Sequence, residues 1–312
     1  MTDNSRIFSE LLSQPLRQSG EYAEYMRGKG WLVEEVRCKN FAVRCFIKKL
    51  PWVGSVIKIQ HPVAIPEEKS LDKLARKYHA LFVKIEPFFG IEKRPSYLQE
   101  DTWPLLPTKT LYLDLETDLA KIKESLDSDA QYSIRKAKSL LCVNRYPADN
   151  FEQLRLFCKI LRRTGGRKKF YTPDWEDLKT KAKSFGKKAS LLLARKKKPR
   201  KKGNGLEHPV AGCLLFTHKK TAFYHHAATS EEGRDLLAGY LVLWEAIKLA
   251  KERDKRFFDF EGIYDSRYHK QTKDWRGFTY FKKKFGGKEV VFPKPLVKYY
   301  SLPLKLMFKI FG

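Results

Sequence analysis

The first candidate for chemistry is a lysine-rich stretch near the C-terminus, GFTYFKKKFGG. Its three consecutive lysines, Lys282, Lys283 and Lys284, stand between Phe281 and Phe285. A lysine ammonium held against aromatic rings can bind an anion, or stabilise negative charge that develops during a reaction. The alternative is a solvated strand, in which Lys283 shares a face with the two rings and the other two lysines lie opposite.

A second candidate lies in the segment PVAGCLLFTHKKTAFYHHAA, residues 209–228, which predicts a hairpin that turns at Lys219-Lys220. Tyr224 and His226 are two positions apart, so we expect them on one face of a strand. A histidine there can take a proton from an attacking ammonium. A single strand histidine is more often a packed or hydrogen-bonded residue, and that interpretation stays open.

The third candidate is a basic run, RKKKPRKKGNG, in which seven of the eight residues 195–202 are basic. We expect a mobile hairpin loop between two strands. Either it is a solvated tip, or it holds phosphates without sequence preference. The predicted phosphate contacts are Arg195, Lys196, Lys197, Lys198, Arg200, Lys201 and Lys202.

The net charge points to a polyanionic partner. The chain has 63 Lys and Arg against 36 Asp and Glu, a net charge of +27. Residues 1–120 hold 18 basic and 16 acidic side chains, so residues 121–312 hold 45 and 20 and carry +25 of that charge. Such a field attracts nucleic acid or an anionic membrane. General basicity that aids solubility is the alternative.

Composition narrows the class of protein further. The 312 residues suit two domains, and no apolar run is long enough to cross a membrane. The N-terminus lacks a signal-peptide pattern. Five scattered cysteines without a CxxC pair argue against disulfides and zinc, and the seven histidines form no metal motif. We expect a protein of the reducing cytoplasm without a bound metal.

The predicted elements describe an α/β (α+β) protein in two parts. The first part alternates helices and strands, with a turn at Pro51-Trp52-Val53-Gly54 between two strands. In the second part, Thr117 and Asn150 are predicted helix N-caps, and Gly165-Gly166 is a predicted helix end. Its order of elements is that expected of a GNAT-type N-acyltransferase domain, with helices at 115–140, 150–165, 175–186 and 235–255 and strands at 189–197, 209–228 and 257–263.

The C-terminal half of the chain resembles a known protein family. The segment FYHHAATSEEGRDLLAGYLVLWEAIKLAKERDKRFFDFEGI, followed by GFTYFKKKFGG, resembles the Fem family of peptidoglycan aminoacyltransferases. The upstream motifs VKIEP, LYLDL and QYSIRKAK match family landmarks in the same order. The resemblance covers roughly residues 10–290, and its C-terminal block is the more specific part.

The resemblance implies two tandem GNAT-like domains without a coiled-coil arm. Residues 1–120 would form the domain on the side of the peptidoglycan precursor, with 291–312 packing back on it, and 121–290 the domain on the side of aminoacyl-tRNA. The implied reaction moves an amino acid from aminoacyl-tRNA to an amine of a precursor stem peptide. The implied partners are aminoacyl-tRNA as co-substrate, and lipid II or a UDP-linked muropeptide at the cytoplasmic membrane face. No cofactor and no stable protein partner are expected.

The resemblance also suggests roles for single residues. Phe281 and Lys282 correspond to the family's functional Phe-Lys pair, with Lys282 near the tRNA 3′ end and the developing oxyanion. Lys283 is a further expected phosphate contact. Glu86, in VKIEP, matches an acidic position near the precursor, although a strand-end salt bridge explains it equally well. The other expected substrate-binding positions are Tyr224, His226, Trp175 and Lys169.

Two competing functions remain at this stage. An acyl-CoA-dependent N-acyltransferase cradles pyrophosphate with a glycine-rich loop entering a helix. The corresponding segment is GRDLLAG, where Leu237 replaces the central glycine and Gly239 keeps the final one. The second alternative is a non-enzymatic RNA- or membrane-binding protein. The basic, apolar tail 295–312 either lies on a membrane surface or packs on the first domain.

Overall fold

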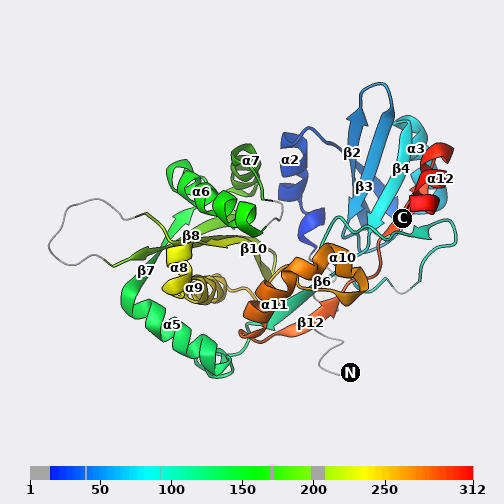
Figure 1. Cartoon of the computed structure of the whole chain (residues 1–312). Helices are drawn as coiled ribbons and strands as arrows, with labels where there is room; N and C mark the ends of the chain where they lie inside the picture. The colour runs from blue at the N-terminus through cyan, green and yellow to red at the C-terminus, as the bar shows by residue number, and fades with distance from the viewer. Residues whose placement is uncertain (1–14, 39–40, 92, 169–171, 198–207, 312) are drawn as a thin grey trace. The chain divides into compact units, whose positions relative to one another are not determined.

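The computed structural model describes residues 15–38, 41–91, 93–168, 172–197 and 208–311. The chain forms two compact units, coloured along the sequence in Figure 1. Unit 1 comprises Met1–Lys109, Asp265–Lys273 and Val291–Gly312, and unit 2 comprises Thr110–Tyr264 and Asp274–Val290. The division after Lys109 differs from the one expected after residue 120, and unit 1 also takes in an internal segment of the C-terminal half.

Unit 1 is built on a six-stranded sheet with the order β1-β2-β3-β4-β13-β5. β3 and β4 are parallel, and the other neighbouring strands are antiparallel. The C-terminal tail does return to this sheet, because β13 pairs with β4. The elements of unit 1 are η1 Leu16–Gln18, α2 Gly20–Gly28, β1 Leu32–Cys38, β2 Phe41–Leu50, β3 Gly54–Gln60, α3 Glu68–Lys77, β4 Ala80–Glu86, β5 Gln99–Glu100, η3 Ser266–Tyr268, α10 His269–Thr272, β13 Leu296–Tyr299 and α12 Leu302–Phe311.

The two faces of this sheet differ in chemistry. One face supplies alternate apolar residues of β3 and β4, such as Ile57 and Val83, which cluster with Leu71 of α3. The residues between them point to the other face and are largely polar, as period-2 strands require. There Tyr22 of α2 donates a 2.9 Å hydrogen bond to the buried Gln60 side chain.

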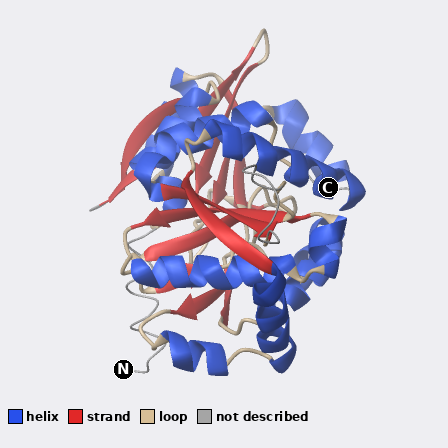
Figure 2. Cartoon of the chain, turned by 90° about the vertical axis from the view of Figure 1, so that its left-hand side faces the viewer, coloured by secondary structure: helices blue, strands red, loops and turns tan. Residues whose placement is uncertain are grey.

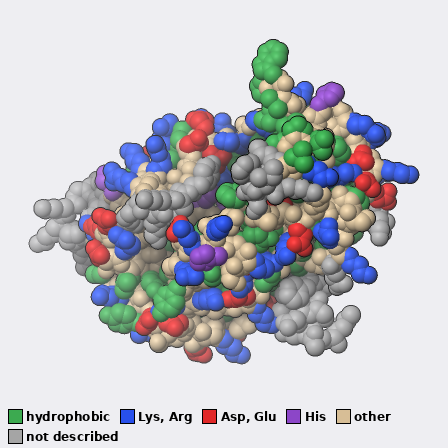
Figure 3. Space-filling model, turned by 45° about the vertical axis from the view of Figure 1, so that its right-hand side comes forward, with side chains coloured by type: hydrophobic (Ala, Val, Ile, Leu, Met, Phe, Trp, Pro, Cys, Tyr) green, Lys and Arg blue, Asp and Glu red, His purple; other side chains and the backbone are tan. Residues whose placement is uncertain are grey.

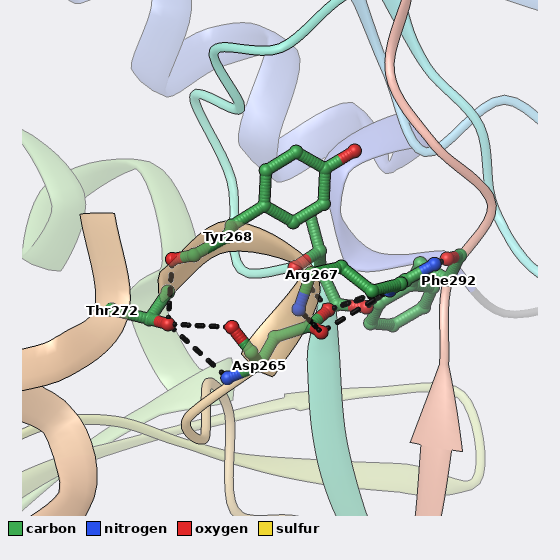
Figure 4. A network of polar contacts seen from close by, with 6 residues as sticks. Asp265, Arg267, Tyr268, Thr272 and Phe292 are labelled. Carbon is green, nitrogen blue, oxygen red and sulfur yellow. Dashed lines mark hydrogen bonds and ion pairs between the residues drawn. The ribbon is translucent and has the colours of Figure 1, made fainter. Parts of the chain in front are cut away.

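A buried polar network ties the internal segment of unit 1 to its surroundings (Figure 4). The Asp265 carboxylate accepts hydrogen bonds from Thr108 Oγ1 at 2.7 Å and from the Arg267 guanidinium at 2.7 Å. Arg267 also donates to the carbonyls of Thr108 and Phe292, and the Thr272 hydroxyl donates to the Asp265 carbonyl. Burial opposes ionisation of Asp265, but the bonds from Arg267 and Thr108 outweigh it and lower the pKa of the carboxyl.

Unit 2 is built on a seven-stranded sheet with the order β12-β6-β11-β10-β9-β8-β7. Helices cover both faces, α6 and α7 on one and α5 and α9 on the other, as Figures 1 and 2 show. β10 and β11 run parallel, as expected where a helix connects them. Its elements are β6 Lys109–Asp114, α4 Leu119–Glu124, α5 Ser128–Leu140, β7 Leu141–Pro147, α6 Phe151–Lys168, α7 Trp175–Phe185, η2 Gly186–Lys188, β8 Ala189–Lys196, β9 Ala211–His218, β10 Thr221–Thr229, α8 Glu231–Asp235, α9 Ala238–Glu252, β11 Phe257–Asp259, η4 Lys273–Trp275, α11 Arg276–Lys283 and β12 Lys288–Val291.

The element boundaries in unit 2 correct several predictions. The single helix expected at 115–140 is two helices, because Asp127 caps a new one by accepting a hydrogen bond from the Asp129 amide. Asp118, and not Thr117, is the N-cap of α4. Asn150 caps α6 as predicted, but this helix continues through Gly165-Gly166. Strand β7 was not predicted.

The lysine-rich stretch is a helix and not a strand. Residues Arg276–Lys283 form α11, so Phe278 and Lys282 lie four positions apart on one face of the helix. Phe285 follows the end of α11, and its ring centre lies 5.6 Å from that of Phe281. No helix in the described residues is long and apolar enough to span a bilayer.

Candidate active site

The centre of the candidate site is the turn that follows β11. Glu261 and Gly262 both have positive φ angles, 49° and 32°. This left-handed backbone turns their carbonyl groups toward α11. The Lys282 ammonium donates a 2.8 Å hydrogen bond to the Gly262 carbonyl and a second bond to the Glu261 carbonyl. The turn therefore fixes the position of Lys282, the lysine that the family resemblance places near the developing oxyanion.

The surroundings of Lys282 are apolar and acidic at once. Its ammonium lies 4.8 Å from the centre of the Phe278 ring. Burial lowers the pKa of Lys282 to about 8, and the nearby Glu261 and Asp259 carboxylates oppose that shift. At neutral pH the group is thus mainly a cation with few water neighbours, which strengthens its interaction with an anion.

Asp259 is the buried acid beneath this turn. Its Oδ1 accepts hydrogen bonds from the Thr110 hydroxyl at 2.6 Å and from the Glu261 amide at 2.7 Å. Burial and the neighbouring Glu261 carboxylate raise the pKa of Asp259 to about 6. Asp259 therefore holds the turn in shape through the Glu261 amide.

Two histidines extend the site along β10. A β-bulge between Tyr224 and His226 shifts the register of this strand against β9. His225 Nδ1 lies 3.0 Å from Glu261 Oε2, and both side chains are largely buried. His226 Nε2 lies 3.0 Å from the ammonium of Lys181, which belongs to α7.

Within unit 2, Glu261 joins these groups. Its carbonyl accepts from Lys282, and its carboxylate contacts His225. A fixed cation and an imidazole paired with a carboxylate are the groups needed to stabilise an oxyanion and to move a proton. The arrangement is suited to acyl transfer to an amine.

The structure places Phe281 differently from the prediction. Its ring packs against Tyr240 and Phe285, with ring centres 4.9 and 5.6 Å apart. A Cβ atom added at Gly239 would lie 3.8 Å from the ring. Phe281 is thus a packing residue that covers the first turn of α9 and helps to fix α11.

The expected pairing of Tyr224 with His226 is wrong. Because of the bulge, Tyr224 points into the core cluster that includes residues of α9, with its ring 6.1 Å from Phe258. His226 points to the opposite face and contacts α7. Burial raises the pKa of Tyr224 well above its ordinary value, so it stays protonated.

Trp175 is the first residue of α7, and its ring packs against α6. The Arg155 guanidinium stacks over its ring at 4.3 Å, and Phe151 meets it edge-on at 6.1 Å. These contacts join the first turns of α6 and α7. Lys169 lies outside the described residues.

Glu86 belongs to unit 1 and is 4 % exposed. Its Oε1 accepts hydrogen bonds from the amides of Leu105 and Leu106, at 2.6 and 2.7 Å. Two residues earlier, the buried ammonium of Lys84 pairs with Asp101 at 2.8 Å. Glu86 and Lys84 together hold the segment 101–106 against β4. Burial raises the pKa of the Glu86 carboxyl.

The predicted phosphate contacts divide into three groups. Arg195 is only 2 % exposed and donates a 2.6 Å hydrogen bond to the Gln153 side chain. The prediction that Arg195 contacts a phosphate is therefore wrong. Lys196, Lys197 and Lys283 are exposed, although Lys196 pairs with Glu232 and Lys283 with Glu289. Lys198, Arg200, Lys201 and Lys202 lie outside the described residues.

Sequence reasoning missed His225, Glu261, Asp259 and Lys181. Two short motifs contain three of these residues: FYHH, residues 223–226, includes His225, and DFEG, residues 259–262, includes Asp259 and Glu261. A regular period-2 strand assigns His226 and Tyr224 to one face and leaves His225 on the other, so only the bulge explains the observed arrangement.

Comparisons with known proteins agree with this description. Residues 195–293 match the model of the FemAB family. A search of curated proteins gave no match. The crystal structure of FemX superposes with a TM-score of 0.76 at 16 % identity, covering 99 % of both chains. The C-terminal domain of a putative lysylphosphatidylglycerol synthetase from Agrobacterium fabrum has a TM-score of 0.60 at 14 % identity, covering 94 % of this chain and 91 % of that one.

These findings confirm the resemblance and the fold. The C-terminal block that carried the resemblance lies inside the matched residues, and it contains His225, Glu261 and Lys282. The chain shares the fold of FemX over nearly its whole length, and each of its two units is built on one sheet with helices packed against it.

Proposed function

We propose that this chain is a Fem-type aminoacyltransferase, which moves an amino acid from aminoacyl-tRNA to an amine of a peptidoglycan precursor stem peptide. The observation that carries the proposal is the Lys282 ammonium, fixed by two carbonyls of the Glu261-Gly262 turn beside the His225–Glu261 pair. All of these residues lie within the part of the chain that matches the FemAB family model.

The reaction is the aminolysis of an ester. The acceptor amine attacks the carbonyl carbon of the aminoacyl ester, a C–N bond forms, and the bond to the ribose oxygen breaks. An ester is already activated, so no nucleophilic Ser or Cys is required. The enzyme must supply a neutral amine, a stabilised oxyanion and a proton for the ribose oxygen.

His225 and Glu261 are proposed to handle the proton. When His225 Nδ1 donates to the Glu261 carboxylate, Nε2 is the basic nitrogen of the ring. The imidazole then accepts the proton that the neutral amine loses as the C–N bond forms, and it donates this proton to the ribose oxygen as the ester C–O bond breaks. Glu261 stabilises the imidazolium that exists in between.

Lys282 is proposed to stabilise the oxyanion. Negative charge on the carbonyl oxygen appears only in the transition state, so a cation fixed beside it accelerates the reaction more than it tightens ground-state binding. The two carbonyls that hold the ammonium limit its movement, so little reorganisation is needed. Phe281 supports this geometry by packing α11 against α9.

The tRNA is proposed to bind along unit 2. Residues 121–312 carry nearly all of the excess positive charge, and the exposed Lys196 and Lys197 begin the basic run that follows β8. Phosphates are held by such cations without sequence preference. Unit 1 is proposed to bind the precursor, lipid-linked or in its nucleotide form, at the cytoplasmic face of the membrane. Glu86 would act there by positioning residues 105–106.

A CoA-dependent acyltransferase is the less favoured function. In that class the pyrophosphate approaches backbone amides at the start of a helix. Here Leu237 adopts a left-handed conformation with φ of 56° before α9, and the Phe281 ring packs over Gly239 in its first turn. The left-handed Leu237 and the Phe281 ring thus lie where backbone amides would have to contact the CoA pyrophosphate.

The test is transfer of radiolabelled amino acids from a charged total tRNA pool to a nucleotide-linked muropeptide. Lys282→Ala is expected to reduce transfer by ~10²-fold or more, the scale of losing one transition-state donor. Lys294→Ala is the control, since Lys294 is an exposed lysine of unit 1 that pairs with Glu100 and is not among the expected phosphate contacts. Turnover of acyl-CoA without transfer from tRNA would overturn the proposal. Label recovered in lipid without muropeptide would instead assign a lipid acceptor, the kind of product that the name of the Agrobacterium protein describes.

A further inference from the structure

The turn between β2 and β3 has an unusual residue at its most restricted position. The Val53 amide donates a 3.3 Å hydrogen bond to the Leu50 carbonyl, which closes a four-residue turn. Pro51 fixes the second residue at negative φ, and Trp52 in third place has φ of 66°. These values define a type II turn, whose third position normally takes glycine or asparagine. A bulky side chain there carries a steric cost.

No packing within unit 1 accounts for that cost. The Trp52 side chain is fully exposed, at 104 % of its reference area, and Val53 is 61 % exposed. Figure 3 shows a projection of hydrophobic side chains at its top, where Figure 1 places the β2–β3 turn. A strained aromatic residue on a convex tip indicates a contact with something outside the chain.

A second apolar element begins at the same end of unit 1. The Ser55 amide, at the start of β3, bonds to the His79 carbonyl just before β4. The Ser301 amide, just before α12, bonds to the Leu81 carbonyl at the start of β4. The first turns of α12 therefore lie at the end of the sheet that carries the turn. They expose Leu302 and Leu306, at 67 % and 53 %.

Cations surround these apolar residues. Lys49 precedes the turn and is exposed, and Arg76 is exposed in the last turn of α3, which ends beside β4. Lys305 lies between the two exposed leucines of α12. Two carboxylates of this region are already paired, Glu34 with Lys77 and Asp72 with Lys298, each at 2.6 Å. We call this region the tip surface; it comprises Trp52, Val53, Leu302, Leu306, Lys49, Arg76 and Lys305.

We propose that the tip surface docks unit 1 onto an anionic lipid bilayer. Tryptophan prefers the interface between headgroups and acyl chains, and a projecting apolar turn enters a fluid bilayer without needing a complementary pocket. Lysine and arginine around it attract anionic headgroups. The exposed leucines of α12 add apolar area in the same place. Docking is peripheral, through a turn and the start of one helix.

This inference rests on the membrane-peripheral part of the proposed function, and not on the transfer chemistry. The first test is sedimentation of the purified full chain with vesicles of phosphatidylcholine alone, or with added phosphatidylglycerol. We expect binding that requires phosphatidylglycerol and falls with salt. Trp52→Asn removes the ring while suiting the left-handed position, and it should lower the partition coefficient about tenfold.

Trp103→Asn is the matched control. Trp103 is also in unit 1 and 63 % exposed, but it lies on the segment that Lys84 holds and not at the tip. This variant should bind vesicles like the wild type. A second measurement is the quenching of tryptophan fluorescence by brominated lipids. This quenching should disappear in Trp52→Asn and persist in Trp103→Asn.

Three outcomes would overturn the proposal. The first is wild type that does not bind anionic vesicles, and the second is equal binding by wild type and Trp52→Asn. The third is self-association without lipid that Trp52→Asn abolishes, since it would make the tip a protein contact. Transfer to a soluble nucleotide-linked precursor needs no vesicle, so it should be unchanged in Trp52→Asn. Loss of vesicle binding alone thus leaves the proposed chemistry standing.

Discussion

His225 Nδ1 lies 3.0 Å from Glu261 Oε2, although 36 positions separate the two residues in the sequence. The contact exists because β10 and β11 run parallel and adjacent, and because a bulge turns His225 toward the end of β11. The same Glu261 presents its carbonyl to Lys282. One residue thus connects the candidate base to the candidate cation.

The first prediction concerns this pair. Glu261→Gln preserves the size of the side chain but removes the charge that stabilises a His225 imidazolium. We expect single-turnover transfer from aminoacyl-tRNA to slow by about 10²-fold or more, the lower end of general acid–base contributions. Binding of the tRNA should be unchanged. Glu231→Gln is the control, because Glu231 is exposed in α8; equal rates in the two variants would refute a role for the pair.

The second prediction concerns the charge of Lys282. Its pKa is lowered to about 8, so the cation is lost as the pH rises through that value. If the cation stabilises the oxyanion, the single-turnover rate should fall above pH 8. Lys282→Arg keeps its charge at all accessible pH values, so its rate, although reduced, should lose this descending limb. If the wild-type rate keeps rising through pH 8, the active form of Lys282 is instead its neutral side chain.

The third prediction concerns Asp259 and stability. Burial and Glu261 raise its pKa from 3.8 to about 6, so between these values the folded protein holds a proton that the unfolded chain has released. The free energy of unfolding should therefore fall as the pH rises across this interval, by up to ~3 kcal/mol from this group alone. Asp259→Asn keeps the acceptor for Thr110 and the Glu261 amide. Urea unfolding at pH 4.5 and 7 should show a smaller difference in the variant than in the wild type.

The fourth prediction concerns the buried ion pair of unit 1. Lys84 and Asp101 are 6 % and 14 % exposed, and their charged atoms lie 2.8 Å apart. Asp101→Asn leaves a buried ammonium without its counter-charge and should lower the free energy of unfolding by roughly 3 kcal/mol. Glu100→Gln removes the exposed partner of Lys294 and should change it by less than ~1 kcal/mol. Similar losses in both variants, measured by urea unfolding, would contradict this account.

Local patterns predicted most elements correctly. The strands on either side of Pro51-Trp52, the hairpin at Lys219-Lys220 and the helix ending at Gly186 are where the sequence predicts them. Each depends on turn residues, caps and periodicity, which are properties of neighbouring residues. The lysine-rich stretch shows the limit of such patterns, because a segment of eleven residues fits a strand and a short helix about equally well.

The sequence by itself determined the α/β class, the charge asymmetry and the resemblance to the Fem family, since these follow from composition and short motifs. Only the tertiary structure decided which side chains meet. The bulge in β10 separated Tyr224 from His226 and brought His225 to Glu261. Arg195 is buried in the folded chain, so it is not available to contact a phosphate. Strand pairing and burial depend on residues far apart in the chain, and spacing along the sequence does not encode them.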